Sequence, residues 1–118
     1  MLIVEDEILI QKSLRKLLEK KGFDVDTASS GHEAIRLILD NKYNRIVCDL
    51  MLQDISGFDV IEESKQKYDL EEISKIFVII TAYSSPQVIS KAEKYNCVIL
   101  NKPFDNIKDA INTFITLE

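Results

Sequence analysis

The sequence predicts an α/β fold in which a doubly wound, five-stranded parallel sheet is covered by helices on both faces. Short solid apolar runs alternate along the chain with segments whose apolar residues recur at helical spacing, a pattern typical of buried parallel strands joined by helices. The three Gly and two Pro residues fall between these segments, as expected of turns. Because parallel crossovers are right-handed, the alternation favours a sheet between two helical layers.

The first half of the chain predicts two strand–helix units. Leu2–Val4 is a solid apolar run, and the helix after it ends before Gly22, which suits a left-handed C-cap. Residues 23–26 alternate in polarity and predict the second strand. Ser30 and Glu33 form the pattern of a capping box, which opens the second helix. The apolar faces of the two helices are Ile10, Leu14, Leu17 and Leu18, and Ala34, Ile35, Ile38 and Leu39.

The second half repeats the pattern with three strands and three helices. The strands are expected at residues 46–48, 77–80 and 97–100. Ser85-Pro86 supplies an N-cap and a proline in the first turn of one helix, and Asp105 is expected to cap the last helix. The apolar positions of the three helices are Val60 and Ile61, then Val88, Ala92 and Tyr95, then Ile107, Ala110, Ile111, Phe114 and Ile115.

Length and composition limit the class of protein. The 118 residues, 46% of them hydrophobic, suffice for one core, so we expect a single domain over residues 1–118. The net charge of −5 argues against direct binding of nucleic acid or an anionic membrane. No apolar run approaches the length of a membrane span or a signal peptide, so we expect a cytoplasmic protein. Cys48 and Cys97 are then buried thiols, and the single histidine, His32, is a surface residue.

Chemically active side chains follow four of the predicted strands. Glu5 and Asp6 follow the first, Asp49 the third, Thr81 the fourth and Lys102 the fifth. Since ligands of such folds bind beyond the carboxyl ends of the strands, these side chains are expected to converge there. Three carboxylates so close together require a compensating positive charge, and a hard cation such as Mg²⁺ suits oxygen ligands. An aspartate beside Mg²⁺ can act as a nucleophile toward a phosphoryl group, whose charge Lys102 would help to neutralise.

In this order and spacing, the motifs resemble those of response-regulator receiver domains of two-component signalling, over essentially the whole chain. The resemblance implies the flavodoxin-like (βα)5 fold of chemotaxis-type receivers, with strand order 2-1-3-4-5. The matching motifs are Leu2-Ile3-Val4-Glu5-Asp6-Glu7, Cys48-Asp49-Leu50-Met51-Leu52 running to Gly57, Ile80-Thr81-Ala82, and Lys102-Pro103-Phe104.

The resemblance also implies a role for each matched residue. Asp49 is the phospho-acceptor, and Mg²⁺ is held by Asp6, by Glu5 through water, by Asp49 and by the backbone carbonyl of Met51. Thr81 is the switch hydroxyl that turns toward the phosphoryl group. Lys102 contacts a phosphoryl oxygen, and the Lys102-Pro103 peptide is expected to be cis.

The implied function is a phosphorylation-gated signalling module without turnover of an external substrate. A partner histidine kinase or a phosphotransfer protein donates the phosphoryl group to Asp49 in a Mg²⁺-dependent step. The change then reaches the helix that begins at Pro86, the strand at 97–100 and the last helix, which dock a downstream effector or a second copy of the chain. In this scheme the phosphoryl dianion shifts a pre-existing equilibrium between an inactive and an active state of these elements.

Three features depart from the family pattern, one of them being Tyr95-Asn96 in place of the usual Gly-Ala before the last strand. Ile99 replaces the usual aromatic residue of the switch, and Gln53 replaces a proline in the loop after the acceptor. Met51 and Tyr83 lie at the positions that tune loss of the phosphoryl group, and neither is a general base for water, so we expect slow self-dephosphorylation.

Three other functions stay open from the sequence. A degenerate receiver would bind partners without phosphorylation, and Ile99 leaves room for it. A small Mg²⁺-dependent phosphatase would need an acid where Met51 lies, and a flavodoxin-like binding module would need a hydroxyl- and Gly-rich phosphate loop where Glu5 to Glu7 lie. The chain is either a stand-alone docking protein or a fragment of a longer regulator or hybrid kinase, and Leu117-Glu118 resembles a cloning remnant.

Overall fold

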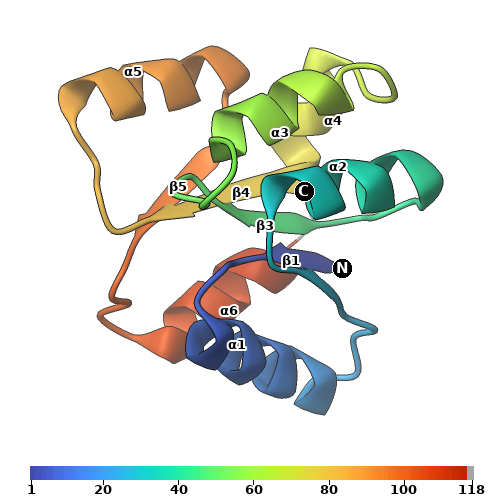
Figure 1. Ribbon diagram of the computed structural model, residues 1–118. Coiled ribbons are helices and arrows are strands. Elements are labelled where there is room, and N and C mark those ends of the chain that lie inside the picture. The colour runs from blue at the N-terminus through green and yellow to red at the C-terminus, as the bar shows by residue number, and fades with distance from the viewer. Residues whose placement is uncertain (117–118) are drawn as a thin grey trace.

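The computed structural model describes residues 1–116 and places five strands in one sheet, with helices on both faces (Figure 1). All neighbouring strands are parallel, in the order β2-β1-β3-β4-β5. The predicted fold class and strand order are therefore confirmed, while the interpretation of Leu117-Glu118 lies outside the described residues. The strands are β1 (Leu2–Val4), β2 (Asp26–Ala28), β3 (Ile46–Asp49), β4 (Phe77–Thr81) and β5 (Val98–Asn101). The helices are α1 (Ile8–Lys20), α2 (Gly31–Asp40), α3 (Gly57–Ser64), α4 (Leu70–Ile76), α5 (Pro86–Tyr95) and α6 (Ile107–Ile115).

The sheet separates two apolar cores. Helices α1 and α6 cover one face, and α2, α3, α4 and α5 cover the other (Figure 1). Residues of a strand alternate between the cores: Ile3 packs toward α1 and α6, whereas Leu2 and Val4 pack toward the other layer. Complete burial of one such aliphatic side chain stabilises the fold by about 1.5–3 kcal/mol. No helix within residues 1–116 has the length and apolarity needed to cross a membrane.

Two predicted helix ends are confirmed. After α1, Gly22 has a φ of 91°, and its N–H donates to the carbonyl of Glu19 at 3.0 Å. The N–H of Phe23 donates to the carbonyl of Leu18 at 3.2 Å, which completes a Schellman motif. At the start of α5, the hydroxyl of Ser85 accepts a hydrogen bond from the N–H of Val88 at 3.2 Å.

The position of β2 was predicted wrongly. The strand spans Asp26–Ala28 and not 23–26, because its first partner in β1 is Leu2, paired with Asp26. Residues before Asp26 have no residue of β1 to pair with, since β1 itself begins at Leu2. Alternation of polarity in 23–26 therefore reflects burial of Val25 and not strand pairing.

Two predicted caps were wrong in detail. The N-cap of α6 is Asn106 and not Asp105: the side-chain oxygen of Asn106 accepts from the N–H groups of Lys108 and Asp109 at 2.9 and 3.3 Å. At α2, Ser30 does cap the N–H of Glu33, but the Glu33 carboxylate accepts from the N–H of Ser29. The reciprocal half of the predicted capping box thus lies one residue earlier.

Two apolar residues expected in the core are exposed. Leu39 is 37% exposed, because it lies about 100° around α2 from the buried Ile38. Ile107 is 39% exposed in the first turn of α6, before the buried residues of that helix begin at Ala110. Of the two cysteines predicted to be buried, Cys48 is buried and Cys97 is only partly so.

Helix α4 was not predicted. Its N-cap is Asp69, whose carboxylate accepts from the N–H of Glu72 at 2.8 Å, while Glu72 accepts from the N–H of Asp69 at 3.1 Å. Only Ile73 of this short helix is fully buried, so its apolar periodicity is weak. The Asp69-x-x-Glu72 spacing is the signal that would have revealed it.

Asp54 ties the loop after β3 to the start of α2. Its carboxylate accepts from the N–H groups of Gly31 and His32, both at 2.9 Å, and lies 2.7 Å from Nδ1 of the exposed His32 ring. These bonds, led by the one from the His32 N–H, hold the pKa of Asp54 well below its usual range. Ile55 packs closely on Gly31: a Cβ atom at position 31 would lie 2.3 Å from Cγ1 of Ile55.

We expect Asp54→Ala to lower the free energy of unfolding at pH 7 by about 1 kcal/mol, the typical value of a helix cap. The native pKa of Asp54 is depressed, so its contribution is complete above the unfolded pKa of about 3.9 and declines as pH falls below it. Urea unfolding of wild type and variant at pH 7 and pH 3 measures this. The difference should be largest at pH 7 and shrink at pH 3.

Asp40→Ala is the matched control, because Asp40 is exposed at the other end of the same helix. A loss of stability at Asp40→Ala equal to that at Asp54→Ala, or a difference independent of pH, contradicts the assignment of Asp54 as a cap.

Candidate functional site

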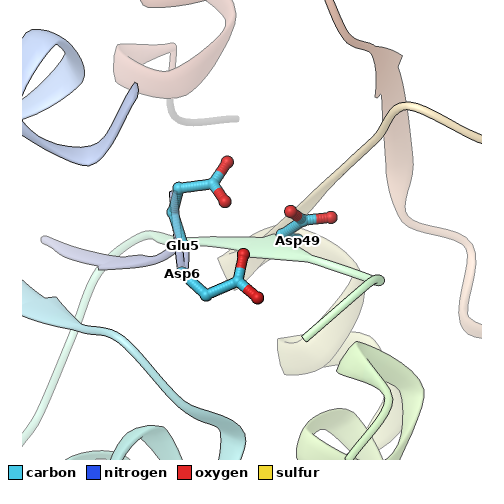
Figure 2. A group of neighbouring side chains, drawn as sticks. All are labelled: Glu5, Asp6 and Asp49. Atoms are coloured by element: carbon cyan, nitrogen blue, oxygen red, sulfur yellow. The ribbon is translucent and has the colours of Figure 1, made fainter. Parts of the chain in front are cut away.

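Three carboxylates meet at the carboxyl edge of the sheet. Glu5 and Asp6 follow β1, and Asp49 ends the neighbouring strand β3. One oxygen of each lies within 4.8 Å of those of the other two, and Figure 2 shows the three side chains gathered between the ends of these strands. Glu5 and Asp49 are buried, and Asp6 is partly exposed. The predicted convergence of these acids is therefore observed.

Lys102 compensates part of this negative charge. Its Nζ donates to Oε1 of Glu5 at 2.8 Å and to Oδ2 of Asp49 at 2.7 Å, and all three side chains are buried. The exposed Glu7 lies farther from the same ammonium, at 3.5 Å. The chain thus joins the ends of β1, β3 and β5 through one buried cation.

The charges shift one another's protonation. Burial raises the pKa of Glu5 to about 7, with a further rise from the Asp49 charge, while the hydrogen bond from Lys102 opposes the increase. Burial acts to lower the pKa of Lys102, but its bonds to Asp49 and Glu5 outweigh this effect and raise it. Lys102 therefore stays an ammonium, and Glu5 is a carboxyl group whose charge depends on a nearby cation.

The backbone around the acids is held by buried polar groups. Nε2 of Gln11, on α1, donates to the carbonyl of Glu5 at 2.9 Å, and the N–H of Glu7 donates to Oε2 of Glu5 at 3.1 Å. The role of Gln11 was not predicted from the sequence. The signal was a polar residue on the face that Leu14 and Leu18 share, three and seven positions before them.

The turn after Asp49 permits only glycine at position 57. A Cβ on Gly57 would lie 2.4 Å from the carbonyl oxygen of Asp49 and 2.9 Å from Cα of Leu50. The N–H of Gly57 donates to the carbonyl of Leu50 at 3.0 Å, and the N–H of Met51 donates to Oδ1 of Asp49 at 3.0 Å. This tight turn orients the Asp49 carboxylate toward Lys102.

Thr81 ends β4 beside the acidic cluster and is buried. Its hydroxyl donates to the carbonyl of Tyr83 and accepts from the N–H of Tyr83, both at 3.0 Å, so it is turned toward its own loop. The backbone N–H of Lys102 donates to the carbonyl of Thr81 at 2.7 Å, and the Lys102-Pro103 peptide is cis, as predicted. The side chains of Met51 and Tyr83 are both exposed.

The donor set fits a hard divalent cation. Mg²⁺ is held by one or two carboxylates and by carbonyl oxygens, and keeps several waters. The site offers three carboxylates against one ammonium, and Asp6 reaches the surface, where an ion can enter. A cation is therefore electrostatically favoured at this cluster.

Comparison with known proteins agrees with this architecture. The family model of the response regulator receiver domain matches residues 1–112. The non-phosphorylated HemR receiver domain of Leptospira biflexa has a TM-score of 0.85 and 27% identity, covering 99% of this chain and 94% of that one. The TrrA response regulator of Thermotoga maritima, in complex with Mg²⁺ and beryllofluoride, has a TM-score of 0.70 and 28% identity, covering 97% and 96%.

Among curated proteins, the probable transcriptional regulator ycf29 of Pyropia yezoensis is 27% identical over 106 residues, covering 89% of this chain and 47% of that protein. The chain spans about half the length of the ycf29 relatives that it matches. The family match over 1–112 and the parallel sheet with acids at its carboxyl edge lead to one conclusion: this chain belongs to the response regulator receiver domain family of two-component systems.

Proposed function

We propose that this receiver domain is cytoplasmic and accepts a phosphoryl group on Asp49 from a partner histidine kinase or phosphotransfer protein, in a Mg²⁺-dependent step. The observation that carries the proposal is the buried Asp49 carboxylate, held 2.7 Å from the Lys102 ammonium beside two further acids. In this reaction the Asp49 oxygen attacks phosphorus, a P–O bond forms, and the P–N bond to the donor histidine breaks. The domain promotes its own modification and turns over no external substrate.

Met51 and Lys102 would have different roles at the Asp49 carboxylate. The N–H of Met51 orients one oxygen of Asp49 and leaves the other toward Lys102. As negative charge passes to the phosphoryl oxygens, the Lys102 ammonium would move toward them, because its flexible side chain lets it pair with the strongest nearby anion. This movement would release Glu5 and Asp49 from their present bonds to Lys102.

The metal site would be formed by Glu5, Asp6, Asp49 and the backbone carbonyl of Met51. Mg²⁺, when bound, supplies positive charge to the transferring phosphoryl group. TrrA, a receiver of the same fold, is observed with Mg²⁺ and beryllofluoride, which supports this assignment.

The switch would begin at Thr81. Its hydroxyl would exchange the backbone of Tyr83 for a phosphoryl oxygen and draw the 81–85 loop inward. Because that loop leads into α5, and Lys102 leads from β5 toward α6, the surface of α5, β5 and α6 would respond. That surface, which includes the exposed Val98 on the edge strand β5, would then bind an effector or a second copy of the chain.

We expect incubation with acetyl phosphate and Mg²⁺ to add one phosphoryl group to the wild-type chain. Asp49→Ala, or omission of Mg²⁺, should abolish the addition. Intact mass spectrometry measures the modification, and amide NMR should show shifts at Thr81 and α6. A folded wild-type chain that gains no mass and shows no shifts would instead be a degenerate receiver.

A protein donor has an apolar surface to bind beside the site. Leu9 is 82% exposed, and Ile8 and Ile107 are also exposed. Leu9 and Ile107 line a hollow with Lys102 and Phe104, at the same edge as Asp49. A donor histidine must approach this edge, so the cluster of Ile8, Leu9 and Ile107 would contact the protein that carries it.

We expect Leu9→Glu to slow phosphotransfer from a histidine kinase by about tenfold or more, since it places a charge where the complex would bury an apolar side chain. Phosphorylation by acetyl phosphate should be unchanged, because the small donor needs no docking surface. Leu39→Glu, the same change at an exposed leucine on α2, is the control. Equal loss with both donors would show damage to the site and refute a docking role for Leu9.

A further inference from the structure

Arg45 is a buried cation far from the phosphorylation site. It immediately precedes β3, at the amino edge of the sheet, opposite Asp49. Arg45 is only 6% exposed, and Nη2 donates to the backbone carbonyl of Thr116. Its Nε is buried and has no hydrogen-bond partner among the described residues. A guanidinium stays charged at all accessible pH values, so burial without an acid is costly.

No carboxylate within the described chain balances this charge. Burial lowers the pKa of Arg45. Asp24 and Arg45 both line a second hollow. Among residues 1–116, however, no salt bridge within 4.0 Å joins Arg45 to an acid. Replacement of such a group by an apolar residue is commonly neutral or stabilising. Arg45 therefore calls for a functional explanation.

Arg45 lines a groove of about 550 Å³ between α4 and α6. Its described lining includes a second cation, Lys75, and otherwise neutral residues. The ammonium of Lys75 lies 3.4 Å from Glu71 in an exposed pair, and such pairs are weak enough to open. Two cations in one groove of a chain with net charge −5 mark a local site for an anion.

The donors of the groove fit a carboxylate. The hydroxyls of Ser74, Thr113 and Thr116 already donate to carbonyls of their own helices. The remaining side-chain donors are Arg45, Lys75 and the amide of Asn112. Three donors suit the two oxygens of a planar carboxylate, which a guanidinium can also bind in parallel.

We propose that the groove between α4 and α6 binds a carboxylate group through Arg45, with Lys75 and Asn112 as further donors. The ligand is either a free carboxylate ion or the acidic side chain of a polypeptide. The site is separate from the phosphorylation site and does not depend on it.

The proposal is tested by titrating the ¹⁵N-labelled chain with sodium acetate and with N-acetylglutamate α-amide, at constant ionic strength and without Mg²⁺. We expect saturable amide shifts at Ser74, Lys75 and Thr113. Arg45→Met should weaken binding about tenfold or more, the loss expected for a charge-assisted donor. The exposed Arg36→Met is the matched control and should bind like wild type. Tighter binding of the glutamate compound identifies a polypeptide as the source, and equal binding identifies a free carboxylate.

The absence of saturable shifts in the groove, or equal shifts in Arg45→Met, would overturn the proposal. Thermal unfolding supplies a second measurement that does not require a ligand. We expect Arg45→Met to melt at or above the wild-type temperature in carboxylate-free buffer. If Arg45→Met and Asp24→Asn each lower the melting temperature and their effects do not add, Asp24 is the partner of Arg45 and the groove is no binding site.

Discussion

The buried contact of Lys102 with Glu5 and Asp49 is the constraint on which the site depends. Bonds of 2.8 and 2.7 Å join the ends of three strands through one ammonium. Removal of one partner from such a buried group typically costs about 3–5 kcal/mol, because the remaining charge is left without compensation. Three carboxylates nevertheless exceed one ammonium, so the site retains an affinity for further positive charge. The excess of negative charge that Lys102 partly compensates thus also favours the binding of a cation.

The fold supplies this arrangement through its parallel strands and the turns after them. Strand ends that are distant in sequence lie side by side because the order β2-β1-β3-β4-β5 places β1 next to β3 and β4 next to β5. Gly57 allows the turn after Asp49 to close, and Gln11 holds the carbonyl of Glu5. The Thr81 hydroxyl hydrogen-bonds the backbone of Tyr83, in the loop that follows β4. The proposed switch requires this hydroxyl to leave Tyr83 for a phosphoryl oxygen.

The sequence predicted the parallel sheet and the meeting of the acids with Lys102, because strand ends in a parallel sheet share one edge. The strand order came from the resemblance to receiver domains. The sequence did not predict features that arise from tertiary context. The start of β2 depends on where β1 begins. Asn106 caps α6 because its side-chain oxygen accepts a hydrogen bond from a backbone N–H of that helix, which the residue type alone does not reveal. Helix α4 has one fully buried residue, so its periodicity was too weak to detect. Burial of Arg45 has no signal in a single sequence, since arginines are usually exposed.

A structure of the chain with Mg²⁺ and beryllofluoride tests most directly whether Lys102 and Thr81 move to the phosphoryl group on Asp49. We expect the fluoride mimic on Asp49, with Nζ of Lys102 moved from Asp49 Oδ2 to a fluorine atom. The Thr81 hydroxyl should leave the carbonyl of Tyr83 and face the mimic. If beryllofluoride binds Asp49 while Lys102 keeps its present bonds and Thr81 keeps Tyr83, the site accepts the group without switching, and the central claim is wrong.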